Sequence, residues 1–179
     1  MSDSLRDRRL IFLVGGRGSG KSTVGQLLAA HLRWQFVDAD VMMEAQAGRT
    51  IAAIFASEGE AGFRNREAAL LNDLAKRFDS VIATGGGVVL RPDNRIRLRE
   101  SGICIWLAAD PQVLWERIEA DPITAARRPA LTKLPGLAEV ERLLREREPL
   151  YREVAHLTVD GSQSPDGAVS SILSAWRSL

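Results

Sequence analysis

Cysteine and long apolar runs are scarce in this sequence. Cys104 is the only cysteine among 179 residues, so no disulfide can form within the chain. This scarcity excludes a disulfide-stabilised secreted scaffold and a cysteine-based zinc site, and it favours the reducing cytoplasm. The longest apolar run covers residues 103–109, far short of the roughly 20 residues that a membrane-spanning helix needs. The first nine residues hold no apolar segment of signal-peptide length. We therefore expect a cytoplasmic protein with no membrane partner.

An excess of either charge is also missing. Lys and Arg total 24 against 23 Asp and Glu, a net charge of +1, which gives no reason to expect nucleic acid as a partner. Four arginines fall between residues 91 and 99, but Asp93 and Glu100 lie among them without aromatic residues. That pattern is typical of a solvated helix face. His31 and His156 lack the spacing of zinc ligands. With 45% apolar and 26% charged residues, the composition indicates an ordinary globular protein.

The length of the chain predicts one domain, residues 1–179, because domains average about 150 residues. Short apolar runs typical of strands buried on both faces alternate with amphipathic stretches typical of helices. The expected strands are residues 10–14, 36–37, 81–83, 103–107 and 157–159. The expected helices are residues 24–32, 50–57, 62–76, 93–99, 111–120, 137–147 and 165–176, and Asp110 is placed to cap the helix that Pro111 opens. The alternation predicts an α/β fold, with helices on both sides of a parallel sheet.

A glycine-rich loop follows the first expected strand. Residues 15–22 read GGRGSGKS and match G-x-x-x-x-G-K-[ST] between a strand and a helix, the setting that a phosphate-binding loop requires. Backbone N–H groups and the helix N-terminus favour phosphate oxygens there. Lys21 is expected to reach the β- and γ-phosphates of ATP, and the Ser22 hydroxyl to ligate Mg²⁺. The alternative is a glycine-rich turn with a surface lysine, although only three lysines exist in the chain and one occupies the motif position.

Two aspartates, Asp38 and Asp40, follow the second expected strand. If the strand continues through them, both carboxylates project to the same side of the sheet. One can then help to hold the metal ion through water, while the other meets the hydroxyl of a phosphoryl acceptor. The alternative is a solvated loop or a helix cap, since aspartate caps helices readily. The neighbouring glycine-rich loop favours the functional interpretation, because the carboxyl ends of parallel strands meet at one edge.

Two arginines are candidates for holding an anionic acceptor. Arg64 follows Phe63 and precedes Glu67 by three residues, which places the arginine and the glutamate on one helix face. Arg147 stands near the end of another helix. A guanidinium matches a carboxylate through two hydrogen bonds, although an exposed ion pair is the usual outcome of such spacing. Residues 85–87 are three glycines after the third strand, and they would admit a ligand close to the backbone.

An irregular segment, residues 121–136, contains three prolines and the pair Arg127-Arg128. We interpret it as part of a mobile lid, about residues 119–136. An arginine on a closing loop can stabilise the charge that builds on the transferring phosphoryl group. Closure also excludes water, which would otherwise hydrolyse ATP. A basic, solvent-exposed loop is the alternative.

In their order along the chain, these motifs resemble the shikimate kinase family over essentially the whole length. The resemblance rests on the glycine-rich loop, Asp38-Ala39-Asp40, Phe63-Arg64-x-x-Glu67, Thr84 with residues 85–87, Arg128-Pro129, and Arg147-x-Pro149-x-Tyr151. It implies a P-loop fold of the nucleoside-monophosphate-kinase type, a three-layer sandwich whose five-stranded parallel sheet has the order 2-3-1-4-5. It also implies a monomer in which residues of about 38–76 bind the acceptor.

The activity that this resemblance implies is ATP-dependent phosphorylation of the 3-hydroxyl of shikimate, with Mg²⁺ as cofactor, on the route to chorismate and the aromatic amino acids. Asp40 then contacts the acceptor hydroxyl, Asp38 binds Mg²⁺ through water beside Ser22, and Arg64 and Arg147 clamp the carboxylate. The acceptor pocket is completed by Gly85, Gly86 and Gly87 along the ring and by an apolar wall of Phe55 and Phe63.

On the ATP side, the resemblance implies contacts from the loop and from three residues elsewhere. The full set is Gly15, Gly16, Arg17, Gly18, Ser19, Gly20, Lys21, Ser22, Thr23, Arg117, Arg128 and Pro165. Arg117 resembles the arginine that stacks on adenine opposite Pro165. Arg128 resembles the lid arginine that acts in catalysis together with Lys21 and Asp40. This chain departs from many members at Ala130, where they have leucine, and at residues 162–164, where they have an arginine-bearing adenine loop.

Two other interpretations stay open at this point. A related P-loop kinase for gluconate or a nucleoside monophosphate shares the same chemistry, because a two-arginine clamp alone does not distinguish carboxylate from phosphate. A nucleotide-binding module that holds ATP without turnover is the second. Such a module needs neither an acceptor-side acid nor a lid arginine, whereas this chain has Asp40 and Arg128.

Overall fold

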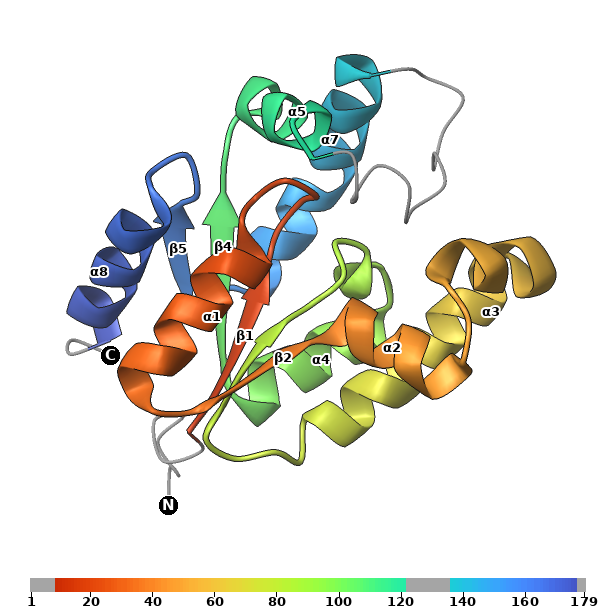
Figure 1. Cartoon of the computed structure of the whole chain (residues 1–179), viewed down its shortest axis with the longest axis horizontal. Coiled ribbons are helices and arrows are strands. Elements are labelled where there is room, and N and C mark those ends of the chain that lie inside the picture. The colour runs from red at the N-terminus through yellow and green to blue at the C-terminus, as the bar shows by residue number, and fades with distance from the viewer. Residues whose placement is uncertain (1–8, 122–135, 177–179) are drawn as a thin grey trace.

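Five short strands form one parallel sheet in the computed structural model, which describes residues 9–121 and 136–176 (Figure 1). The strands are β1 (Leu10–Val14), β2 (Gln35–Asp38), β3 (Ser80–Ala83), β4 (Ile103–Ala108) and β5 (Leu157–Asp160). Their order across the sheet is β2-β3-β1-β4-β5, and every neighbouring pair is parallel. The predicted fold class and strand order are confirmed.

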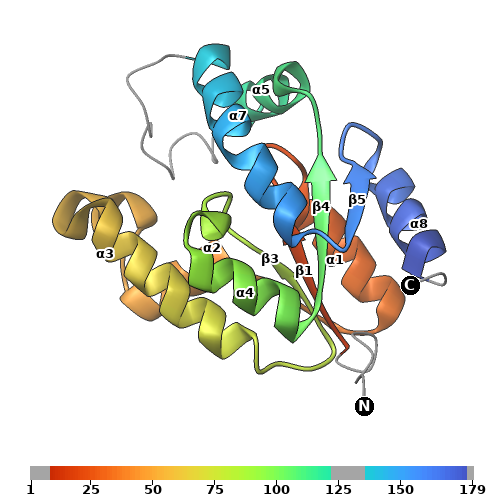
Figure 2. The same ribbon diagram turned by 180° about the vertical axis from the view of Figure 1, so that it is seen from behind.

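Helices cover both faces of this sheet. They are α1 (Lys21–Leu32), α2 (Ala39–Ala47), α3 (Ile51–Leu74), α4 (Pro92–Ser101), α5 (Pro111–Glu119), α7 (Leu137–Val154) and α8 (Pro165–Trp176), with a short 3₁₀ helix at Val88–Leu90. In Figure 1 α1 lies in front of the sheet near α8, and Figure 2, seen from behind, brings α4 and α7 to the front. The three layers follow from parallel strands, whose crossover helices must pack on one face or the other.

Side chains of β1 alternate between two hydrophobic cores, because successive residues of a strand point to opposite faces. Phe12 packs in a core with residues of α3, α4 and α7, whereas Leu13 packs in a core with residues of α1 and α8. All five residues of β1 are at most 1% exposed. Burying the apolar surface of such side chains contributes about 1.5–3 kcal/mol each. The predicted core role of Cys104 is confirmed, since its side chain in β4 is fully buried and burial raises the pKa of its thiol.

The second strand differs from its prediction. β2 ends at Asp38, and Asp40 lies in the first turn of α2, a helix that hydrophobic periodicity did not indicate. The expectation that a strand runs through both aspartates is wrong, because the Asp38 carboxylate accepts hydrogen bonds from the backbone N–H groups of Asp40 and Val41 and so starts a helix there. Asp110 does occupy the N-cap position of α5, but its side chain makes no capping hydrogen bond.

Two helices are longer than the sequence pattern indicated. α3 joins the predicted helices 50–57 and 62–76 across Gly59, whose backbone departs from helical geometry. α7 continues past residue 147 through Pro149 to Val154. Proline removes one hydrogen bond of the helix ladder, but Tyr151 and Val154 are buried against the sheet, and this packing carries the helix onward. No helix in the described parts of the chain is long and apolar enough to cross a membrane.

Candidate active site

Polar and glycine-rich segments follow three neighbouring strands at one edge of the sheet. Gly15 follows β1, Asp38 ends β2, and Thr84 with residues 85–87 follows β3. Because β2, β3 and β1 are adjacent and parallel, these segments meet where their strands end, as ligand-binding segments do in open α/β sheets. The Thr84 hydroxyl donates a hydrogen bond of 2.9 Å to the Leu13 carbonyl oxygen, which ties the end of β3 to the end of β1.

The glycine-rich loop owes its shape to backbone conformations that residues other than glycine rarely adopt. Gly15, Gly18 and Gly20 have φ angles of 146°, 80° and 87°, values that glycine reaches at little cost. A Cβ on Gly18 would also lie 2.6 Å from the Leu114 carbonyl oxygen. Gly20 occupies the N-cap of α1 and has no side chain to cap it. The loop therefore leads directly into a helix N-terminus whose backbone dipole favours an anion.

Lys21 lies folded over this loop. Its ammonium group donates hydrogen bonds to the carbonyl oxygens of Gly15 and Gly16, at 2.9 and 2.8 Å, and to the Ser19 hydroxyl at 3.3 Å. Ser19 is itself 1% exposed, so the loop packs tightly beneath the lysine. An ammonium group has three protons that can exchange these acceptors for phosphate oxygens. Its place is the one that a phosphate-binding lysine requires.

Asp38 joins the loop to the second strand. The Ser22 hydroxyl donates a hydrogen bond of 2.6 Å to the Asp38 carboxylate, whose other oxygen caps α2 at 3.0 Å from the Asp40 nitrogen. The capping alternative is thus correct for Asp38, while its second oxygen still meets the phosphate-binding loop. The hydroxyl and the carboxylate are hard oxygen donors of the kind that Mg²⁺ prefers. Within residues 9–121 and 136–176, no cluster of three His, Cys, Asp or Glu residues suits a metal ion.

A cavity of about 340 Å³ opens over the loop. Residues from the loop, from both aspartates and from α5 line it together, among them Lys21, Ser22, Asp38, Asp40 and Arg117. Lys21, which is predicted to meet the phosphate donor, and Asp40, which is predicted to meet the acceptor, line one space. The cavity is therefore large enough, and has the right groups, for phosphates on one side and a hydroxyl on the other.

Arg64 lies against the third glycine segment. Its guanidinium donates a hydrogen bond of 2.7 Å to the Glu67 carboxylate and lies 3.5 Å from that of Glu60. The Arg64 side chain is only 11% exposed, so this ion pair is not the exposed one that the R-x-x-E spacing usually produces. A Cβ on Gly87 would overlap the Arg64 guanidinium. Gly87 is consequently required because it leaves space for the guanidinium. Its φ angle of −99° is an ordinary one.

Arg147 approaches the same carboxylate from α7. Arg147 and Glu67 are 8% and 6% exposed, and burial raises the pKa of Glu67 against the opposing pull of Arg64 and Arg147. A Cβ on Gly86 would lie 3.6 Å from an Arg147 guanidinium nitrogen and 3.4 Å from the Gly15 carbonyl oxygen. The glycine segment therefore lies between the phosphate-binding loop and both arginines. The fold thus brings the two predicted clamp arginines together.

Tyr151 is a residue of this site to which the sequence analysis gave no role. Its hydroxyl donates a hydrogen bond of 2.5 Å to the Gly86 carbonyl oxygen, and its side chain is 1% exposed. The spacing of four residues from Arg147 to Tyr151 places both on one helix face, which is the signal that could have identified it. A second cavity, of about 90 Å³, is lined by Gly86, Arg147 and Tyr151 together with Arg17.

Arg17 lines both cavities. Partial burial lowers the pKa of its guanidinium, while Glu139 and Asp121 act in the opposite direction. The prediction placed Arg17 among the ATP contacts as a member of the loop.

The aromatic pair predicted for the acceptor wall lies behind Arg64. The rings of Phe55 and Phe63 stack with centroids 4.5 Å apart, and the Arg64 guanidinium lies 5.1 Å from the Phe63 ring, within the range of a cation–π contact. Phe63 is 4% exposed. Neither the two rings nor Arg64 lines the two cavities described above, and the Phe63 ring packs against the arginine.

The two predicted adenine residues differ in whether they line the larger cavity. Arg117 donates to the carbonyl oxygens of Gly161, at 2.6 Å, and Ser162, at 3.2 Å, which links α5 to the loop after β5. It also lines the larger cavity. Pro165 opens α8 and is not among the lining residues of either cavity. Arg128, Arg127 and most of the predicted lid, about residues 119–136, lie outside the described residues.

Known proteins resemble this chain in sequence and in fold. The family model for shikimate kinase matches residues 17–177, and a shikimate kinase of Rhodopirellula baltica is 45% identical over 97% of this chain and 93% of its own. The chain belongs to the shikimate kinase family. A structure of the shikimate kinase from Acinetobacter baumannii in complex with shikimate covers 98% of both chains with a TM-score of 0.88 and 37% identity. The shikimate kinase of Aquifex aeolicus gives a TM-score of 0.80 at 34% identity.

Membership of the shikimate kinase family confirms the resemblance that the motifs indicated. The chain is a kinase that uses ATP to phosphorylate shikimate, in the synthesis of aromatic amino acids. A gluconokinase from Sinorhizobium meliloti shares the fold with a TM-score of 0.62, but its identity of 22% shows no more than the fold. The interpretation as a module that holds ATP without turnover is wrong.

Proposed function

We propose that transfer to the 3-hydroxyl of shikimate takes place in the cavity that Lys21 and Asp40 share. The observation that carries this proposal is the common lining of one space by a phosphate-binding lysine and an acid in the first turn of α2. Phosphoryl transfer has a loose transition state, so placing the acceptor oxygen in line with the γ-phosphate provides most of the catalysis. The Asp40 carboxylate accepts the proton of the hydroxyl as the new bond to phosphorus forms.

On the donor side, residues Gly15 to Thr23 hold the phosphates through backbone N–H groups, and Lys21 bridges the β- and γ-phosphates. Arg117 is proposed to stack on adenine opposite Pro165. The place of Arg117 beside the larger cavity supports its part, while Pro165 rests on the resemblance to the family alone. Arg128, on residues that the structure does not describe, is proposed as the lid arginine that stabilises charge on the γ-phosphoryl group.

Mg²⁺ is the proposed cofactor, and two side chains fit it. The Ser22 hydroxyl would ligate the ion directly and the Asp38 carboxylate through water, since their oxygens already lie 2.6 Å apart at the amino end of α1. When bound, the ion neutralises charge on the β- and γ-phosphates. Asp38 orients Ser22 and anchors Asp40 through its capping bond, so it ties the metal side of the site to the acceptor side.

On the acceptor side, Arg64 and Arg147 are proposed to bind the shikimate carboxylate, with residues 85–87 along the ring and Phe55 and Phe63 as the apolar wall. Both arginines converge on the buried Glu67 and flank the glycine segment. A carboxylate that enters there can accept hydrogen bonds from both guanidinium groups. Residues of about 38–76 form this acceptor subregion, and 119–136 the lid, of a single domain spanning 1–179.

The decisive experiment offers shikimate, gluconate and a panel of nucleoside monophosphates side by side to the wild-type enzyme and to Asp40→Asn, with ADP release as the readout. Shikimate should support turnover far above the other acceptors. The Asp40→Asn variant should lose about a hundredfold or more in kcat with little change in the affinity for ATP. An unchanged kcat would assign Asp40 a purely structural part.

The proposed monomer is checked by light scattering on the same sample. The proposed cytoplasmic location is checked by fractionation of the host cell.

A further inference from the structure

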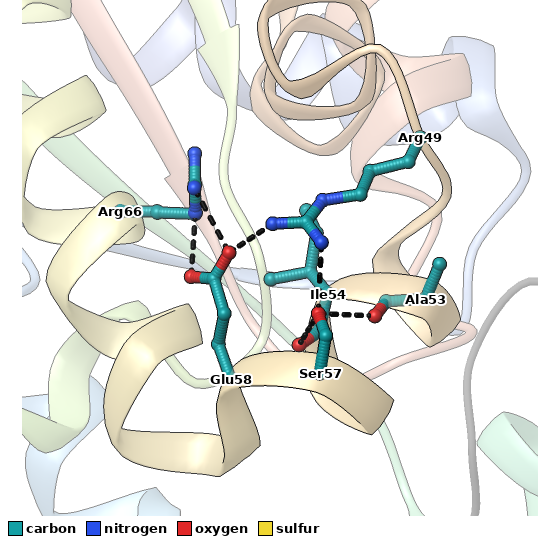
Figure 3. Close-up of polar contacts among 6 residues, drawn as sticks. All are labelled: Arg49, Ala53, Ile54, Ser57, Glu58 and Arg66. Carbon is teal, nitrogen blue, oxygen red and sulfur yellow. Dashed lines mark hydrogen bonds and ion pairs between the residues drawn. The ribbon is translucent and has the colours of Figure 1, made fainter.

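Polar contacts around the first half of α3 form a cluster that the proposed mechanism does not use (Figure 3). The helix is interrupted at Gly59, whose φ of 68° and ψ of −175° belong to a region open essentially to glycine alone. Residues 51–58 precede this break, and residues 60–74, which include Arg64 and Glu67, follow it. Glu58 is therefore the last residue of the first segment, one position before the break.

The Glu58 carboxylate joins three parts of the chain. One of its oxygens accepts a hydrogen bond of 2.7 Å from Arg66 Nε, and the other accepts bonds from Arg66 Nη2, at 2.9 Å, and from Arg49. Arg49, in the turn before α3, also donates to the Ser57 hydroxyl at 2.8 Å. The Arg66 contact is a two-point ion pair, the geometry in which an arginine restricts a carboxylate most.

The break at Gly59 makes this pair possible. In an unbroken α-helix, residues eight apart are about 12 Å apart along the axis, too far for a two-point contact. Here Glu58 and Arg66 meet because the second segment turns relative to the first. The hydrogen bond from Arg66 is the main cause that lowers the pKa of Glu58, so the carboxylate stays charged at neutral pH. The Glu58 side chain is 26% exposed and that of Arg66 42%, so solvent screens the pair in part.

The angle between the two segments reaches the proposed acceptor pocket through aromatic rings. Phe55 belongs to the segment before the break and Phe63 to the segment after it, and their rings stack across it at 4.5 Å. The Phe63 ring in turn lies 5.1 Å from the Arg64 guanidinium. A change in the angle at Gly59 would therefore shift the support on which Arg64 rests.

We propose that Glu58 is a positioning residue for the acceptor. By joining Arg49 and Arg66 across Gly59, it holds Phe55 against Phe63 and so keeps Arg64 in place for the shikimate carboxylate. This inference rests on the proposed assignment of Arg64 and Phe63 to the acceptor pocket. Glu58 acts through other residues, so its loss should weaken shikimate binding without altering the donor side or the chemical step.

The test compares Glu58→Gln, Arg66→Gln and the double variant with wild type, varying shikimate and ATP separately. We expect the KM for shikimate to rise about threefold to tenfold in each single variant, as the loss of a partly screened, two-point ion pair allows. The KM for shikimate of the double variant should be no higher than that of Glu58→Gln, because Glu58→Gln and Arg66→Gln remove the same ion pair. The kcat and the KM for ATP should stay within about twofold of wild type. A pair at the carboxyl end of α3 serves as a control. Asp73 in the last turn of the helix and Lys76 just after it form an exposed ion pair of 3.0 Å, and Asp73→Asn should change neither KM.

Three results would overturn the inference: an unchanged KM for shikimate in both single variants, a parallel rise in both KM values, or additive effects in the double variant. A lower melting temperature with an unchanged KM counts as the first of these, because it assigns Glu58 to stability alone. Arg64→Ala in the same series separates this inference from the proposed function. If Arg64→Ala raises the KM for shikimate and Glu58→Gln does not, only the positioning role fails. If Arg64→Ala leaves that KM unchanged, the acceptor assignment fails first.

Discussion

The donor and acceptor regions of this kinase are held in shape by different means. The phosphate-binding loop is built from backbone: three glycines at positive φ, and a lysine whose ammonium group bonds to carbonyl oxygens of its own loop. The proposed acceptor region is built from charged side chains: Arg64 and Arg147 lie around the buried Glu67, and Glu58 lies between two more arginines. Backbone geometry is specified locally, whereas a charged cluster requires residues that are distant in the sequence.

This comparison explains the two kinds of glycine in the site. Gly15, Gly18 and Gly20 permit a backbone conformation, while Gly87 leaves room for the Arg64 guanidinium. A substitution in the first group distorts the main chain. A residue that replaces Gly87 can adopt the same main-chain conformation, but its Cβ displaces the Arg64 side chain. The two regions should therefore fail in different kinetic parameters.

The largest effect is expected from Lys21→Ala. The lysine supplies a positioned positive charge beside the phosphates, and removing one preorganised donor of this kind lowers kcat by about 100- to 1000-fold. Steady-state kinetics with both substrates saturating give the comparison. Near-wild-type turnover would show that the loop backbone alone suffices. Lys76→Ala, which removes an exposed lysine at the end of the α3 region, is the matched control and should leave kcat unchanged.

Arg64→Ala should act on the acceptor instead. Loss of a charged hydrogen bond costs about 1.5–3 kcal/mol, which corresponds to a rise in the KM for shikimate of roughly ten- to a hundredfold. The KM for ATP should change little, because Arg64 does not line the cavity over the phosphate loop. If the KM for ATP rose instead, the division into a backbone-built donor region and a charge-built acceptor region would be wrong.

Gly87→Ala tests the same division with a smaller change. At a φ of −99° alanine is tolerated, but its Cβ would overlap the Arg64 guanidinium. We expect the KM for shikimate to rise by about threefold to tenfold as the arginine shifts, in keeping with an overpacking cost of about 1 kcal/mol. Gly86→Ala meets only ordinary contacts at 3.4–3.6 Å and should have a weaker effect. Equal effects at both positions would contradict the steric argument.

The smallest effect concerns stability rather than activity. Burial raises the pKa of Glu67 above its ordinary value of 4.5, so the folded state favours the protonated acid. The stability that this preference contributes is present below the unfolded pKa and is lost as the pH rises through the higher folded pKa. The melting temperature of wild type minus that of Glu67→Gln should therefore decrease between pH 4 and pH 7, by on the order of a few degrees.

The exposed Glu146, paired with Arg142 on α7, is the matched control for this measurement. Glu146→Gln, measured in the same way, gives the effect of removing an exposed carboxylate. A difference for Glu67→Gln that grows with pH would show that the two arginines, rather than burial, dominate the titration of Glu67.

Much of the fold followed from local pattern. Continuous apolar runs predicted the three central strands β1, β3 and β4, because strands buried on both faces leave no polar position. The edge strands β2 and β5 were predicted from shorter patterns. The interruption at Gly59 falls between the two helices predicted at residues 50–57 and 62–76, whereas the α2 helix was missed. Helix α2 begins where the Asp38 side chain caps it. A side-chain contact rather than hydrophobic periodicity decides the geometry there.

The sites divide in the same way. Lys21 and Ser22 could be assigned from their spacing, since the loop is one continuous stretch between a strand and a helix. The buried Arg64–Glu67 pair could not be distinguished from an exposed one, because burial depends on Gly87 and on α7, which lie elsewhere in the chain. No sequence motif indicated the hydrogen bond from the Tyr151 hydroxyl to the Gly86 carbonyl oxygen.

By itself, the sequence determined the phosphate-binding loop, the parallel sheet and the family, because each depends on order and spacing along a continuous chain. Only the tertiary structure decided which charges are buried together. Arg64, Glu67 and Arg147 come from two helices on one face of the sheet, and the glycines between them come from the end of a strand. Electrostatic interaction depends on distance through space and on exclusion of water, and neither quantity is written in the spacing of residues.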